Sequence, residues 1–217
     1  MMPLRITACM VSGIVTYDRW IALDGLLHHV AWTRAGRPKY WETNPGAQYE
    51  LPLERVEFPE GRWCWCATWA MADWQKSDAV YVNRRFPVQR RELLHESVTR
   101  IGTSSGRFKG YRMPMPREWS SELVWYAAGD AEQVQGMLNE LPNIGKKATR
   151  GHGRVREWSV EEVEEADLVD GEGYALRSLP VDYEGLSDAG REIRAYARLL
   201  PPYIPKLEQE ELCVPRV

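Results

Sequence analysis

Long apolar runs are missing from this sequence of 217 residues. No stretch approaches the ~18 consecutive apolar residues that a membrane-spanning helix requires. Residues 1–11 alternate between apolar and polar side chains, unlike the continuous apolar block of a secretory signal peptide. We therefore expect a cytoplasmic protein that makes no contact with a membrane.

Cysteine is also scarce, with 4 residues in the chain. Cys64 and Cys66 form a single close pair, and no second pair follows that would complete a tetrahedral zinc site. Cys9 and Cys213 stand alone, so we interpret all four residues as reduced thiols. The sequence therefore predicts neither a metal site nor a cofactor.

The two common phosphate-binding fingerprints are absent as well. A Walker loop requires a glycine five residues before its Gly-Lys pair and Ser or Thr after the pair. Here Gly145 and Lys146 are followed by Lys147, and no glycine stands at the earlier position. A dinucleotide-binding loop leads from a strand into a helix, whereas residues 143–156 follow a helix pattern and precede a strand pattern. Nucleotide-dependent enzymology is therefore not expected.

Residues 143–156 nevertheless contain three glycines and five Lys or Arg residues, without one Asp or Glu. Glycine tolerates positive φ and lets backbone N–H groups approach an anion, while the cations neutralise the anion. This chemistry suits phosphate, although a simple turn with a solvated basic rim shows the same pattern. The candidate phosphate-binding residues of this stretch are Gly145, Lys146, Lys147, Arg150, Gly151, His152, Gly153 and Arg154.

Charge is distributed unevenly along a chain whose net charge is −3. Residues 83–117 contain nine Lys or Arg against two Asp or Glu, and residues 157–192 contain two against twelve. Blocks this well separated indicate one surface for phosphate and a different surface for other contacts.

Apolar spacing predicts an α+β fold. The order of the expected elements fits the βαββαβ layout of ferredoxin-like and RNA-recognition domains, with both helices on one face of the sheet. Asp130 and Gln133 form a capping box at the start of the second helix. The expected strands cover residues 4–10, 63–69, 79–82, 123–128 and 154–160, and the expected helices cover residues 23–35 and 130–141.

Three regions follow from this order. We expect a ferredoxin-like domain at residues 1–160 with an insertion at about 71–121, and an irregular extension at residues 161–217 that packs on the domain and contains a short helix at 188–200. The insertion, a hairpin or a flexible loop, carries Arg107, Lys109 and Arg112 beside aromatic residues. Such a mixture holds a nucleic-acid backbone and stacks a base, although a solvated loop is the alternative interpretation.

The motif Gly145-Lys146-Lys147-x-x-Arg150-Gly151-x-Gly153-Arg154-Val155 resembles the C-terminal glycine-rich loop of the RAMP superfamily of CRISPR-Cas RNA-binding proteins. Residues 23–27, 177–181 and 211–215 are similar to the Cas-five-like subunit of type IV effector complexes. The resemblance implies a RAMP domain whose basic insertion is a thumb-like hairpin. It also implies a noncatalytic subunit that holds the 5′ handle of the guide RNA (crRNA) and caps the backbone filament.

The partners implied by this resemblance are the guide RNA, a backbone (Cas-seven-like) subunit and the large subunit, with target DNA contacted indirectly. Certain RAMP nucleases use a histidine near their first helix, and His28 and His29 lie on the polar flanks of the first predicted helix. A metal-independent endoribonuclease that processes repeat RNA is therefore the alternative function. A structural assembly protein, whose basic blocks meet an acidic partner, is the third hypothesis.

Overall fold

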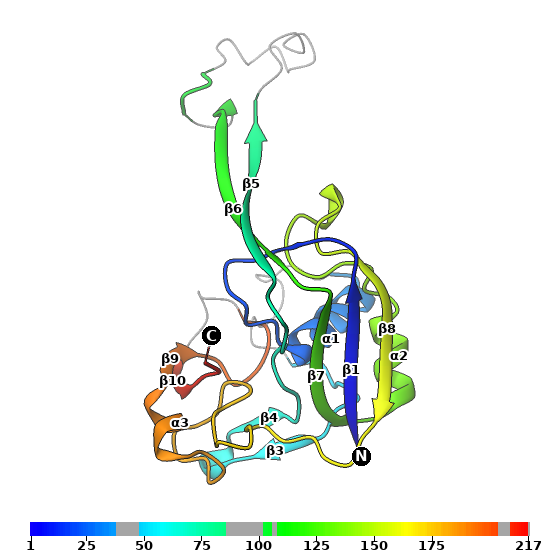
Figure 1. Ribbon diagram of the computed structural model, residues 1–217, viewed down its shortest axis with the longest axis vertical. Coiled ribbons are helices and arrows are strands. Elements are labelled where there is room, and N and C mark those ends of the chain that lie inside the picture. Colours follow the sequence, from blue (N-terminus) through cyan, green and yellow to red (C-terminus); the bar gives the residue numbers. More distant parts are fainter. Residues whose placement is uncertain (38–47, 86–101, 106–107, 204–208, 217) are drawn as a thin grey trace.

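The structure is a computed structural model that describes residues 1–37, 48–85, 102–105, 108–203 and 209–216. Its centre is an antiparallel sheet in the order β7-β1-β8, formed by Glu122–Gly129, Met2–Met10 and Val155–Glu162 (Figure 1). Alternate side chains of β1, Leu4, Ile6 and Ala8, are fully buried. The alternation predicted for the first strand is therefore confirmed, and the chain has an α+β fold.

Two helices cover one face of this sheet (Figure 1). They are α1 (Leu23–Arg34) and α2 (Ala131–Leu138), whose apolar side chains Leu27 and Leu138 share a core with the sheet. The N-cap at Asp130 is confirmed, because its carboxylate accepts hydrogen bonds from the backbone N–H of Gln133 (3.0 Å) and from the Gln133 side-chain amide (2.7 Å). The reciprocal bond of a capping box is replaced, since the Asp130 N–H donates to the Pro52 carbonyl at 3.0 Å.

The strand predicted at residues 63–69 is shorter than expected. β4 (Trp63–Trp65) pairs with β3 (Arg55–Glu57) around the 3-10 turn η1 (Pro59–Gly61), and the chain then runs beside β7 through isolated bridges. These bridges join Ala67 to Ala127 and Met71 to Val124. Irregular pairing of this kind leaves some backbone carbonyls without a hydrogen-bond partner in the sheet. The buried Arg177 donates hydrogen bonds to two of these carbonyls, those of Trp65 and Ala67.

A long hairpin projects from the sheet (Figure 1). It consists of β5 (Lys76–Arg84) and β6 (Tyr111–Trp119), with the two-residue strand β2 (Ile14–Val15) beside β6. A hairpin was one of the two structures expected for this insertion, although β6 itself was not assigned a range in the sequence, where Pro114 and Pro116 argue against a strand. The prolines are tolerated because β2 pairs with β6 only at Arg117 and Glu118, which leaves the edge beside the prolines without a paired strand in the described chain.

The prediction of a helix at residues 188–200 is wrong beyond Glu192. α3 (Asp188–Glu192) starts at the Ser187 cap and ends where Ile193 adopts an extended backbone. The chain continues as β9 (Arg194–Ala197), which pairs with β10 (Glu210–Cys213). Pairing with a strand near the C-terminus overrides the weak local helix preference, and this pairing leaves no local signal in the sequence.

Arg177 ties this C-terminal region to the sheet. Its side chain is fully buried and donates hydrogen bonds to the carbonyls of Trp65, Ala67 (3.1 Å) and Leu199 (2.6 Å). Its guanidinium lies 3.4 Å from the buried Asp24 carboxylate, which also accepts a hydrogen bond from the Tyr203 hydroxyl (2.8 Å). Burial raises the pKa of Asp24, while Arg177 and Tyr203 act in the opposite direction.

Replacement of this arginine should destabilise the whole fold. Arg177→Met leaves the Asp24 carboxylate buried without its cation and removes the guanidinium hydrogen bonds to the carbonyls of Trp65, Ala67, Ser178 and Leu199. Removing one partner of a buried ion pair costs about 3–5 kcal/mol of the free energy of unfolding. Urea unfolding at pH 7 measures this loss.

Arg194→Met is the matched control, because Arg194 pairs with Glu211 at the surface, where a pair contributes about 0–1 kcal/mol. Equal unfolding midpoints for the two variants would contradict the structural role assigned to Arg177.

Candidate nucleic-acid interface

The glycine loop, defined here as residues 143–154, is anchored by backbone hydrogen bonds at both limbs. The Ile144 N–H donates to the Gly153 carbonyl at 2.7 Å, which closes the loop on itself. The Lys146 N–H donates to Val15 of β2 at 2.8 Å, and the Gly153 N–H donates to Gly13 at 2.9 Å. The loop is therefore fixed against the β1–β2 connection, at the base of the hairpin.

Positive φ values explain why the loop needs glycine. Gly145, Gly151 and Gly153 have φ of +81°, +81° and +64°, and Lys147 has φ of +64° although it carries a Cβ. A Cβ on Gly153 would lie 1.8 Å from the Ile144 carbonyl oxygen, whereas a Cβ on Gly151 would meet nothing within 4 Å. Gly153 is thus required for closure of the loop, while Gly151 is required only for its backbone angle.

The cations of the glycine loop are not neutralised by acids. Lys146, Arg150 and Arg154 are exposed and Lys147 is half-buried, and none of the four forms an ion pair within the described part of the chain. Ten arginines elsewhere pair with carboxylates, namely Arg5, Arg19, Arg34, Arg55, Arg62, Arg117, Arg177, Arg191, Arg194 and Arg216, whereas the ion pairs of the described residues do not include Arg112, Arg156 or Arg198. Unpaired exposed cations on a fixed backbone suit the binding of a polyanion.

His152 is half-buried within the loop. Its carbonyl accepts a hydrogen bond from the Asn143 side chain at 3.0 Å. Burial lowers the pKa of His152, and the nearby cations Arg117 and Arg150 lower it further. Its imidazole is therefore neutral at pH 7 and adds hydrogen-bonding capacity rather than charge.

The other predicted contact residues lie at the far end of the hairpin. Arg112 on β6 stacks on Tyr81 of β5, with its guanidinium 4.0 Å from the ring centroid, and Lys109 is exposed just before β6. Arg107 lies outside the described residues. Arg112 is five residues along the strand from Arg117 at the hairpin base, which corresponds to roughly 17 Å. The structure thus brings the loop residues together and leaves Lys109 and Arg112 apart from them.

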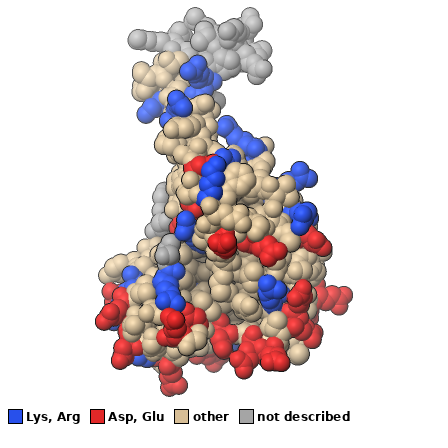
Figure 2. All heavy atoms as spheres, viewed as in Figure 1, with Lys and Arg blue, Asp and Glu red and all other residues tan. Residues whose placement is uncertain are grey.

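The space-filling view places these groups on one basic end of the molecule. Figure 2 shows Lys and Arg along the hairpin and around its base, whereas Asp and Glu dominate the opposite end of the same face. The charge blocks found in the sequence are therefore also separated in space.

Tyr17 was missed in the sequence, and it contacts the glycine loop directly. The Lys146 ammonium lies 3.8 Å from the centroid of the Tyr17 ring, which is 59% exposed. No local motif marks Tyr17, because only the bridge between Val15 and Lys146 brings the two segments together.

The prediction that neither histidine of α1 belongs to the core is wrong for His28. His28 is buried, and its ring meets Tyr49 edge to face at 5.0 Å. His29 is exposed, and burial of part of its ring lowers its pKa, with Arg37 adding to the effect. The apolar stripe of α1 is wide enough to include His28, which its spacing did not reveal.

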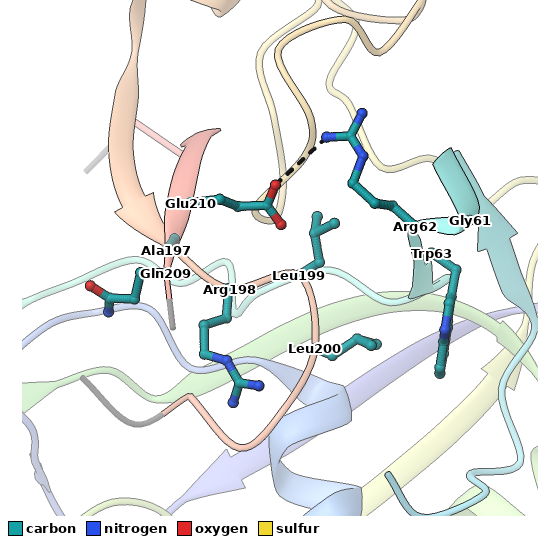
Figure 3. A pocket seen from close by; sticks show the side chains of 9 residues that line it. All are labelled: Gly61, Arg62, Trp63, Ala197, Arg198, Leu199, Leu200, Gln209 and Glu210. Atoms are coloured by element: carbon teal, nitrogen blue, oxygen red, sulfur yellow. Dashed lines mark ion pairs between the residues drawn. The ribbon is translucent and has the colours of Figure 1, made fainter. Parts of the chain in front are cut away.

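A separate pocket of about 440 Å³ lies between the β3–β4 and β9–β10 hairpins (Figure 3). Arg62 points across it toward Glu210, 3.6 Å away, while Trp63 and Arg198 form other parts of its wall. The described residues include no group of His, Cys, Asp and Glu side chains that could hold a metal ion. They also include no helix long and apolar enough to cross a membrane.

Together, these features define an α+β protein whose glycine loop presents exposed cations that form no ion pairs among the described residues. The sequence matches the family model of CRISPR type IV associated protein Csf3 over residues 2–215, so the chain belongs to this family. It is therefore a subunit of a type IV CRISPR effector. No curated protein matches the chain.

The two glycines that flank His152 should respond differently to the same substitution. Gly153→Ala forces a methyl group onto the Ile144 carbonyl and should lower the free energy of unfolding by about 2–5 kcal/mol. Gly151→Ala meets open space and should cost about 1–2 kcal/mol, the penalty for positive φ alone. Thermal unfolding of both variants measures the difference, and a Gly151 variant at least as unstable as the Gly153 variant would contradict this assignment.

Proposed function

We propose that this chain is the noncatalytic guide-RNA-binding subunit of its type IV complex. It would hold the 5′ handle of the crRNA and cap the backbone filament beside a Cas-seven-like subunit and the large subunit, with target DNA contacted indirectly. The observation that carries the proposal is the absence of acidic partners, within the described chain, for the exposed Lys146, Arg150 and Arg154. The cytoplasmic location expected from the sequence is part of the same proposal.

Strand order supports a RAMP-type, ferredoxin-like core. β1 lies between β7 and β8, and both pairings are antiparallel. The segment at residues 66–71 runs beside the other edge of β7, where the Thr68 N–H donates to Tyr126 at 2.9 Å and the Met71 N–H donates to Val124 at 2.8 Å. If this segment counts as the second strand, the order becomes that of a βαββαβ domain, with α1 and α2 as its two crossovers.

The hairpin supports the proposal through its place and its chemistry. β5 and β6 lie within the insertion predicted at residues 71–121, and they project from the same end of the sheet as the glycine loop (Figure 1). Arg112 and Tyr81 present a cation and a half-exposed aromatic ring, a combination that holds phosphate and stacks bases. A guide RNA that leaves the loop along the hairpin would meet both groups.

Removal of the loop cations should weaken RNA binding in a salt-dependent way. The variant Lys146→Ala, Lys147→Asn, Arg150→Ala keeps the loop backbone, since Asn tolerates the positive φ of residue 147. The slope of log affinity against log salt should become shallower by about 0.7 for each phosphate of single-stranded RNA that the variant no longer neutralises. Binding of a labelled synthetic guide RNA across a salt series measures both quantities.

The matched control for this variant is Arg55→Ala, Arg194→Ala, Arg216→Ala. It removes the same charge from arginines that pair with Glu50, Glu211 and Asp170. If the two triple variants show the same affinity and the same salt slope, the glycine loop is only a turn and the proposal fails.

The endoribonuclease alternative has its own test. Purified protein incubated with labelled repeat RNA and a chelator should retain the RNA without cutting it, because His28 is buried and no catalytic partner of His29 has been identified. Cleavage that is lost in His29→Gln would establish the alternative in place of the noncatalytic role. If the protein neither retains nor cuts the RNA, a purely structural assembly protein would be favoured.

A further inference from the structure

A hollow of about 280 Å³ lies beside the glycine loop, in the connection from β2 to α1. Its wall is formed by Thr16, Tyr17, Asp18, Arg19 and Trp20 together with Glu118 of β6. It is smaller than most ligand pockets and matches a single planar ring better than an extended molecule. Tyr17 joins this hollow to the glycine loop, because its ring also meets Lys146.

The Tyr17 ring has one face covered, while much of the side chain remains exposed. The Lys146 ammonium lies 3.8 Å from the ring centroid and therefore covers one face. The residue nevertheless remains 59% exposed, so a large part of its side chain is open to solvent. An exposed tyrosine face beside a lysine suits an RNA nucleotide, because the ring stacks on the base while the cation attracts a phosphate.

The polar groups of the hollow favour a particular kind of base. Both carboxylate oxygens of Glu118 are occupied, one by Arg19 (3.0 Å) and one by Ser77 (2.9 Å). Asp18 uses Oδ1 to accept the backbone N–H of Trp20 (3.2 Å), and its Oδ2 has no partner among the described residues. A free carboxylate oxygen accepts hydrogen bonds from an exocyclic amino group, as found on cytosine, adenine and guanine.

We propose that this hollow binds one unpaired base of the RNA. The base stacks on Tyr17, and its amino group donates a hydrogen bond to Oδ2 of Asp18. The inference rests on the proposed function and adds a base preference that phosphate contacts alone cannot supply. Bases with an exocyclic amino group (cytosine, adenine and guanine) are preferred over uracil, whose single ring N–H lies between two carbonyl oxygens that the Asp18 carboxylate repels.

The test compares the binding of oligo(C) and oligo(U) RNAs of equal length to the full chain and its variants. Tyr17→Ala should weaken oligo(C) binding about 5- to 150-fold, the loss that corresponds to one stacked base. Tyr17→Phe keeps the ring and should bind like the unmodified chain. Asp18→Ala should bring the ratio of the two affinities close to one. Asp18→Asn keeps the Oδ1 acceptor for Trp20 but places an amide N–H donor at the position of Oδ2, so it should shift the ratio further, toward oligo(U).

Two controls separate the possible results. Met2→Ala removes an apolar side chain that is 51% exposed at the start of β1, the end of that strand farther from β2 and the glycine loop, and should leave binding unchanged. The variant Lys147→Asn, Arg150→Ala weakens phosphate binding but retains Lys146. If this loop variant loses RNA while Tyr17→Ala does not, the base site is wrong and the proposed function stands. If neither change affects binding, both are wrong, and equal losses for Tyr17→Phe and Tyr17→Ala would exclude stacking.

Discussion

The fold depends on a buried guanidinium. Arg177 has no exposed surface, and it joins the start of α1, the end of β4 and the region after β9 through Asp24, Trp65 and Leu199. A buried charge is costly unless every donor finds an acceptor. Here Nε donates to the Ser178 carbonyl at 3.3 Å, and the two terminal nitrogens donate to the other acceptors. The planar fork of arginine makes this possible, because it reaches carbonyls that no neighbouring strand could satisfy.

This arrangement explains why an irregular segment can occupy the edge of the central sheet. After β4 the chain makes only isolated bridges to β7, so some carbonyls of residues 65–67 lack a strand partner. Arg177 supplies the missing donors from the C-terminal region and thereby fixes that region against the sheet. The start of α1, the end of β4 and the C-terminal region are thereby held together.

The sequence allowed the local features to be predicted, and the nonlocal features remained hidden. The Asp130 cap of α2, the buried face of β1 and the basic glycine loop each lie within one short stretch, where spacing and composition are informative. The roles of Arg177 and Tyr17 depend on neighbours far away in the chain, so their residue types alone indicate a surface cation and a surface ring. β6 and β9 were hidden for a related reason, since pairing rather than local preference makes them strands.

Hydrogen bonds within the protein define the shape of the glycine loop. Its limbs are closed by the hydrogen bond between Ile144 and Gly153 and held to Gly13 and Val15, so binding need not order its backbone. Ordering a flexible loop would consume part of the interaction energy, whereas a fixed loop presents its cations at constant spacing. Gly153 is required for this shape, because even a methyl group at this position would collide with the Ile144 carbonyl. The motif therefore combines two separable requirements: glycines that close the loop within the protein, and cations that face outward for a polyanion.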